Sequence, residues 1–197
     1  MVTEPRPLAP LPELTGRVAV LGGAASEKTA LLLGLALRQI QQQGIVFCLD
    51  ARRSQQTEIQ VRLLLRDNAT YVSLPPSGEV PTETAQTALK MLSDGLARAQ
   101  QPPLLLLDSV HESSDWERTL SFLLKAGVVV IELLASPAAL VFGRYDTVLL
   151  LRGEGEAADG ISRAVGRKVS AENLMCLKAA EGILIHLARV QWVALPQ

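Results

Sequence analysis

The amino-acid sequence predicts an α/β fold with a mainly parallel central sheet, helices on both faces and an antiparallel hairpin at the C-terminus. Short apolar runs, each long enough for one strand, alternate with longer stretches of helical periodicity. Strands that are apolar on both faces are typical of parallel sheets that helices cover on both sides. Near the C-terminus, two strand-like runs flank only Ala180 and Glu181, and so short a connection indicates an antiparallel pair.

Size and composition fit one globular domain. The chain has 197 residues, of which 48% are hydrophobic and 20% charged. Its net charge of −1 gives no overall attraction to nucleic acid, so DNA binding would need a local basic patch. No apolar run reaches the roughly 18 residues of a membrane span, and the N-terminus lacks the apolar core of a signal peptide. We therefore expect a cytoplasmic protein without a membrane partner.

The elements follow one another in a regular order. Residues 1–13 contain four prolines and are expected to form an extended arm, which could pack on its own domain (14–197) or on a neighbouring molecule. Strands are expected at 17–21, 45–50, 70–74, 104–108, 128–134 and 146–152. Helices are expected at 28–43, 57–68, 82–100 and 112–127. A Gly- and Glu-rich loop at 153–160 then leads to the two hairpin strands, 172–179 and 182–193.

The first strand and helix enclose a sequence that nearly matches a phosphate-binding loop. Residues 17–29 read RVAVLGGAASEKT, against the pattern G-x-x-x-x-G-K-[ST] between a strand and a helix. In such a loop, backbone N–H groups surround the phosphates, the Lys meets the outer phosphates and the Ser or Thr holds Mg²⁺. The candidate nucleotide-binding residues are therefore Gly22, Gly23, Lys28 and Thr29. A strand–turn–helix with an incidental Lys-Thr pair is the alternative.

Glu27 replaces the second glycine of this pattern. Its Cβ lies where the backbone should approach the phosphates, and its negative charge opposes an anionic ligand. The carboxylate could also pair with Lys28 and hold the ammonium away from a nucleotide. We therefore expect ATP and Mg²⁺ to bind weakly or not at all.

A second motif supports the same kind of site. Residues 104–110 read LLLLDSV, in which a buried strand delivers Asp108 to the C-terminal edge of the sheet. A carboxylate placed there can hold a water on Mg²⁺, so Thr29 and Asp108 are the candidate metal residues if a nucleotide binds. Asp108 could instead serve only to end its strand.

With both motifs placed, the chain resembles the ATPase core of RecA-type proteins, a group that includes the archaeal and eukaryotic recombinases and the KaiC-like ATPases. The resemblance rests on GGAASEKT, on FCLDAR (47–52) after the next strand, and on LLLLDSV, and it covers roughly residues 14–190. It implies a RecA-like P-loop NTPase fold, with self-assembly or a protein partner and DNA as the family's usual contacts.

The departures from this family concern the residues that carry out hydrolysis. Where the family has its catalytic Glu, this chain has Arg52, which leaves Asp50 and Glu132 as the remaining candidates for a catalytic base. The segments that resemble the DNA-contacting loops are short, and the first of them is acidic. The resemblance and its departures together suggest a degenerate RecA-like protein, acting as an accessory or regulatory factor in DNA recombination or repair. An active RecA- or KaiC-like ATPase and a purely structural interaction module are the alternatives.

Several basic residues are candidates for contacts with nucleic acid or with a protein partner, which could be a RecA-type protein, another repair protein or a second copy of the chain. A solvated surface is the alternative reading, since runs of charge usually indicate exposure alone. The candidates are Arg52, Arg53, Arg163, Arg167, Lys168 and Lys178.

Overall fold

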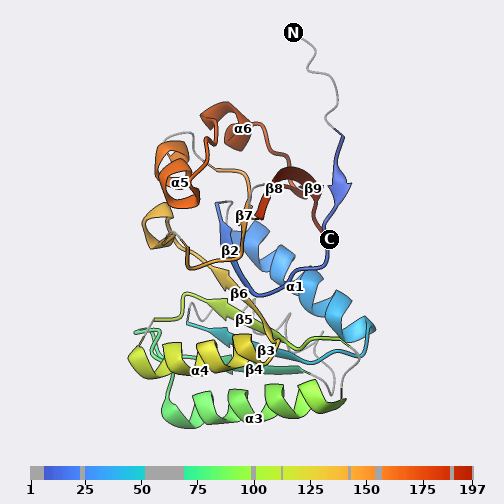
Figure 1. Ribbon diagram of the computed structural model, residues 1–197, viewed down its shortest axis with the longest axis vertical. Coiled ribbons are helices and arrows are strands. Elements are labelled where there is room, and N and C mark those ends of the chain that lie inside the picture. The colour runs from blue at the N-terminus through green and yellow to red at the C-terminus, as the bar shows by residue number, and fades with distance from the viewer. Residues whose placement is uncertain are drawn as a thin grey trace.

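The computed structural model describes residues 7–22, 25–51, 69–98, 101–111, 113–141, 143–153, 157–186 and 189–196. Within these residues one sheet runs in the order β1-β9-β8-β7-β2-β6-β5-β3-β4 (Figure 1). In chain order the strands are β1 (Ala9–Pro10), β2 (Arg17–Leu21), β3 (Val46–Asp50), β4 (Ala69–Ser73), β5 (Leu104–Asp108), β6 (Val129–Leu133), β7 (Thr147–Leu150), β8 (Glu181–His186) and β9 (Arg189–Ala194). The strands from β7 to β4 are parallel, whereas β8 runs antiparallel to both β7 and β9, so the predicted fold class is confirmed.

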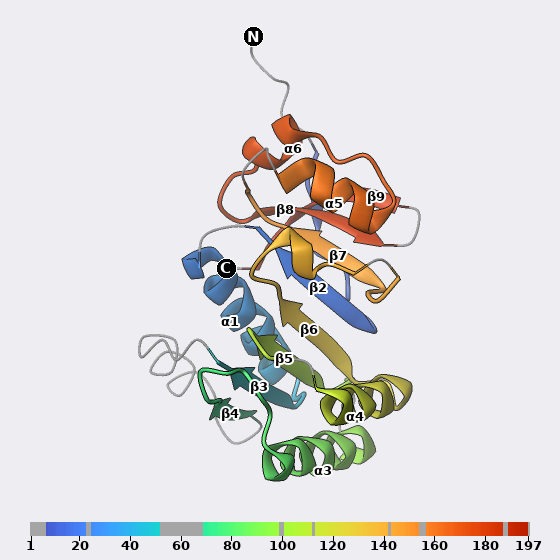
Figure 2. The same cartoon turned by 90° about the vertical axis from the view of Figure 1, so that its left-hand side faces the viewer.

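Helices cover both faces of the sheet, with α1 on one side and α3 and α4 on the other (Figure 2). The α1 face buries Val18 and Val20 of β2, while Ala19 and Leu21 of the same strand pack on the opposite face near α5 and α6. The side chains alternate because successive residues of a strand point to opposite faces. The helices are α1 (Ala25–Gln41), α3 (Thr82–Arg98), α4 (Ser114–Lys125), η1 (Pro137–Ala139), α5 (Ala158–Val165) and α6 (Ala171–Met175).

The C-terminal hairpin is present, but the prediction of its first strand at 172–179 is wrong. Ser170 caps α6 by accepting a hydrogen bond from the backbone N–H of Asn173 at 3.0 Å. Leu174 of α6 is buried, and so is Leu177, which follows the C-cap residue Cys176. The hairpin is instead formed by β8 and β9.

The stretch before α6 also departs from the expected loop. Helix α5 begins at Ala158 and ends at Gly166, whose φ of +65° is the left-handed conformation that commonly closes a helix. The expected loop at 153–160 therefore ends in a helix, and Arg163 lies on that helix. The predicted helix at 57–68 lies outside the described residues.

The described part of the N-terminal arm packs on its own domain. Ala9 and Pro10 pair in parallel with Val193 and Ala194 of β9, and the side chain of Leu11 is buried in the core on the α1 face. Among the helices that the structure describes, none combines the length and the hydrophobicity that crossing a bilayer requires.

Candidate functional site

The turn between β2 and α1 brings Gly22 into close contact with the chain that follows β7. Gly22 has a φ of +86°, which a residue with a side chain rarely adopts. A Cβ on this residue would lie 2.7 Å from the carbonyl oxygen of Leu151 and 3.2 Å from that of Arg152. Both the conformation and the close approach require glycine here. Gly23, the other expected glycine of the loop, lies outside the described residues.

Lys28 is directed towards the end of a neighbouring strand. Its side chain is buried, and its Nζ donates a hydrogen bond of 2.9 Å to the carbonyl oxygen of Leu134. Leu134 directly follows β6, which lies beside β2 in the sheet. A buried ammonium needs such partners because its desolvation is costly. The lysine that should meet a phosphate is thus engaged with the backbone, while Thr29 next to it is partly buried.

Glu27 lies in the first turn of α1 and forms an ion pair with Arg152. The Nη2 of Arg152 donates to Oε1 of Glu27 at 3.2 Å, and the two side chains are 54% and 23% exposed. The sequence offers Lys28 as a possible partner for this carboxylate and does not identify Arg152. An ion pair of this exposure stabilises a fold by roughly 0–1 kcal/mol.

Two carboxylates lie side by side at the C-terminal edge of the sheet. Asp50 and Asp108 are paired residues of β3 and β5, and both are buried. The hydroxyl of Tyr71 donates to Asp50 at 2.7 Å, and that of Ser109 donates to Asp108 at 3.0 Å. Burial, together with the charges of the two carboxylates, raises the pKa of the nearby Cys48 thiol. Strand β6 separates β5, which ends at Asp108, from β2, the strand that precedes α1 and its residue Thr29.

A cavity of about 690 Å³ opens beside the loop that follows β2. Its charged lining residues, among those that the structure describes, are Lys28 and Arg152. The rest of its lining is apolar or glycine, supplied by the end of β2, the η1 segment, the chain after β7, and helices α5 and α6: Leu21, Gly22, Ala135, Pro137, Leu151, Gly153, Ala157, Ile161, Leu174 and Met175. The size lies within the range of ligand-binding pockets.

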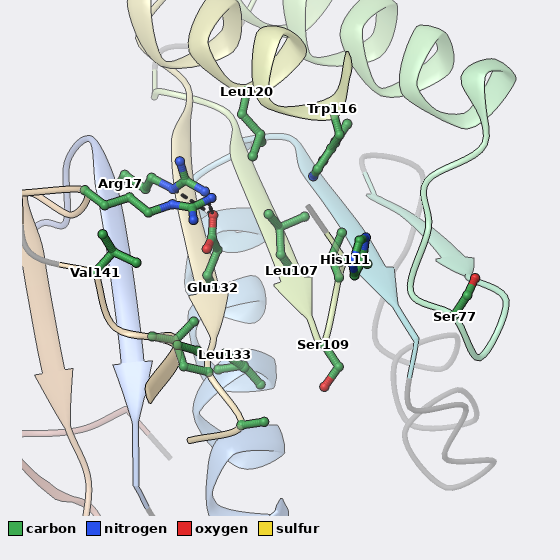
Figure 3. A pocket seen from close by; sticks show the side chains of 15 residues that line it. Arg17, Ser77, Leu107, Ser109, His111, Trp116, Leu120, Glu132, Leu133 and Val141 are labelled. Atoms are coloured by element: carbon green, nitrogen blue, oxygen red, sulfur yellow. Dashed lines mark hydrogen bonds and ion pairs between the residues drawn. The ribbon is translucent and has the colours of Figure 1, made fainter. Parts of the chain in front are cut away.

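Glu132 lies in a different cavity, of about 560 Å³, between α4 and the segment that follows β6. Figure 3 shows Arg17 and Glu132 pointing towards each other in this cavity, with Trp116 and Leu120 of α4 on its wall. The Nε of Arg17 donates to Glu132 at 2.8 Å, and the hydroxyl of Tyr145 donates to the other oxygen of that carboxylate at 2.8 Å.

This buried network extends to two further charged side chains. Both terminal nitrogens of Arg17 donate to Glu117 at 3.2 Å, and Arg144 also pairs with Glu117. Burial alone would raise the pKa of Glu117, but hydrogen bonding and charge from Arg17 lower it on balance. Burial and the charge of Glu132 raise the pKa of Tyr145. Glu132 is therefore part of a charged cluster, and the structure does not bring it to the cavity of Lys28.

Of the basic candidates, Arg52 and Arg53 lie outside the described residues. The other four are exposed and belong to the stretch that leads from α5 to β8. Arg163 turns back on its own helix, where its Nε donates to the carbonyl oxygen of Asp159 at 3.4 Å. Exposure leaves these side chains accessible, which suits either a binding role or a merely solvated surface.

No protein-family model matches the chain, and no curated protein matches its sequence significantly. Solved structures do resemble it. The DNA-packaging ATPase B204 from Sulfolobus Turreted Icosahedral Virus aligns with a TM-score of 0.67 at 11% identity, covering 92% of this chain and 98% of that one. The genome packaging NTPase B204 from Sulfolobus turreted icosahedral virus 2, in complex with ATP-gammaS, aligns with a TM-score of 0.60 at 12% identity over the same shares. The chain thus has the fold of P-loop NTPases.

Proposed function

We propose that this protein is a P-loop protein that has lost nucleotide-driven activity and acts through protein contacts, as an accessory or regulatory factor in DNA recombination or repair. Binding of ATP and Mg²⁺ is weak or absent, and hydrolysis is lost. The observation that carries the proposal is Glu27, which stands in place of the loop's second glycine and is paired with Arg152 beside the cavity of Lys28.

Electrostatics argues against a triphosphate in this loop. A unit charge about 5 Å from another of the same sign costs roughly 3 kcal/mol at an effective dielectric constant of about 20. That corresponds to about a hundredfold in affinity. Lys28, whose charge would offset this repulsion, already donates one of its three N–H groups to the carbonyl oxygen of Leu134.

The candidate catalytic bases are also engaged. Asp50 accepts a hydrogen bond from Tyr71, and Glu132 is paired with Arg17 in the other cavity. The residue that resembles the family's catalytic Glu is Arg52, a cation that cannot take a proton from water. Hydrolysis therefore lacks a positioned general base.

The biological setting follows from the resemblance of the sequence motifs to RecA-type proteins. A chain that keeps this fold without its chemistry still offers a surface shaped like that of an assembling ATPase. A RecA-type recombinase or another repair protein is accordingly the partner we propose, with a second copy of the chain and DNA as further candidates. The exposed basic stretch from Arg163 to Lys178 is the proposed contact surface.

An active ATPase is the second candidate, because Gly22, Lys28, Thr29 and Asp108 are all retained and the cavity beside them is large enough for a nucleotide. Isothermal titration with MgATP and a phosphate-release assay separate the two. We expect affinity no tighter than millimolar and no turnover above background. Turnover of about 1 s⁻¹ or faster, typical of competent enzymes, contradicts the proposal and supports the ATPase.

The partner is tested separately. We expect the protein to co-elute with a RecA-type recombinase from the same source on size exclusion, and exchange of Arg163, Arg167 and Lys168 for Gln to weaken the complex. If neither the recombinase nor single-stranded DNA binds, the assignment to recombination or repair is wrong. The structural interaction module then becomes the better description.

A further inference from the structure

Resting on the function proposed above, we propose that Arg152 is a phosphate-facing cation of the loop cavity and that Glu27 neutralises it. The pair works as a latch beside the cavity. While the ion pair is formed, the guanidinium of Arg152 is bound to Glu27. When the carboxylate is removed, Arg152 becomes available to an anionic ligand beside Lys28. The class of ligand excluded by the latch is the polyphosphates, of which a nucleoside triphosphate is the test case.

The position of Arg152 is fixed by backbone contacts on both sides of it. The N–H of Leu151 donates to the carbonyl oxygen of Leu21, the last residue of β2, at 2.8 Å. The N–H of Gly153 donates to the carbonyl oxygen of Leu174 in α6. Arg152 is therefore held between the phosphate-binding turn and α6, and its carbonyl oxygen lies against Gly22. These contacts keep the backbone of Arg152 beside the loop when its side chain loses a partner.

The side chain of Arg152 is suited to exchanging Glu27 for an anionic ligand. It lines the same cavity as Lys28 and is 54% exposed, so it can turn from Glu27 to an incoming anion without crossing packed core. A guanidinium binds phosphate with two parallel hydrogen bonds, a geometry that a carboxylate also satisfies. Glu27 thus accepts from Nη2 of Arg152, one of the donors that a phosphate would use.

Other ion pairs of the chain show why this one can open. The pair of Arg17 and Glu132 is buried, with 7% and 9% of the side chains exposed, and removing either partner would leave a buried charge. Asp115 and Arg118 of α4 form a more exposed pair at 3.3 Å, against 3.2 Å for Glu27 and Arg152, and they line neither cavity described above. The α4 pair is therefore a matched control for general effects of removing a surface charge.

The experiment is a double-mutant cycle with MgATP as the titrant, measured by calorimetry. We expect Glu27→Gln to tighten binding at least tenfold, which is about 1.4 kcal/mol. Arg152→Ala added to Glu27→Gln should cancel most of that gain, whereas Asp115→Asn should leave the affinity of the wild type unchanged. Increased salt should weaken the binding of the Glu27→Gln variant, because the gain is electrostatic.

Two results overturn the latch. If Glu27→Gln gains nothing, although its circular dichroism and melting temperature match those of the wild type, the carboxylate does not guard the cavity. If the double variant keeps the full gain, Glu27 acts by its own charge and Arg152 has no part in binding. The proposed function is tested separately: it fails if the unmodified protein binds and hydrolyses ATP, or if it binds neither a recombinase nor single-stranded DNA.

Discussion

Lys28 should be a structural residue in this protein, so its replacement should destabilise the fold. Lys28→Met keeps most of the buried stem but removes the donor to Leu134, leaving that carbonyl oxygen without this hydrogen bond. Hydrogen bonds to charged groups contribute about 1.5–3 kcal/mol, and we expect a loss of unfolding free energy of that size. For a chain of this length, about 2–4 °C of melting temperature corresponds to each kcal/mol, so the melting temperature should fall by about 3–12 °C.

Urea unfolding followed by tryptophan fluorescence measures this loss, because Trp116 is buried in the core. Lys178→Met is the matched control: it removes an exposed ammonium, and its effect should stay within about 0.5 kcal/mol. If Lys28→Met is as stable as this control, the ammonium does not hold α1 to the end of β6. The reasoning would then be refuted, and Lys28 would be as available to a phosphate as in an active enzyme.

Three further outcomes are expected. Arg17→Met should lower the free energy of unfolding in urea by about 3–5 kcal/mol, because it leaves the carboxylate of Glu132 buried without Arg17. The double variant with Glu132→Leu should recover most of that loss. An equally unstable double variant would show that the charges are not the cause. The folded-state pKa of Glu117 lies below its ordinary value of 4.5, so its contribution to stability is present above about pH 4.5 and is lost as the pH falls through the lower, folded value. Glu117→Gln should therefore flatten the acid limb of the curve of stability against pH. An unchanged limb would count against the ion pair. Gly22→Ala should lower the unfolding free energy by about 1–3 kcal/mol, since its φ is positive and its Cβ would meet the backbone of Leu151, whereas a neutral result would mean that the turn can open.

The sequence was sufficient to predict most elements that are apolar throughout. Strand β5 shows why, because four leucines followed by Asp108 indicate both a buried strand and the edge where it ends. Its neighbour β3 was predicted for the same reason, and the pairing of Asp50 with Asp108 follows from the parallel register. The local pattern was misleading at α6. The apolar run from Leu174 to Leu177 is too short to distinguish a short helix from a strand.

The contacts of the candidate site could not be predicted in the same way, because they join residues that are far apart in the sequence. Glu27 and Arg152 are separated by 125 positions, and Lys28 and Leu134 by 106. The sequence predicts that Glu27 disturbs a phosphate site, but it does not indicate which cation pairs with this carboxylate. Arg17 was missed because it stands at the start of an apolar strand, where a single charge does not reveal its partner.

Strand β6 connects these observations, because cations from two directions converge on it. Lys28 reaches the carbonyl oxygen just after its end, and Arg17 from β2 meets the carboxylate of Glu132 within it. The phosphates of a ligand at the loop would compete for the first of these cations. Here both are held by the chain itself, and Glu27 similarly holds Arg152. These hydrogen bonds and ion pairs within the chain stabilise one arrangement of the sheet and helices. A ligand that binds one of the cations would therefore compete with the group of the chain that already contacts it. The basic residues from Arg163 to Lys178 are exposed, although Arg163 also donates to the carbonyl oxygen of Asp159, and we propose that an acidic partner surface is recognised there.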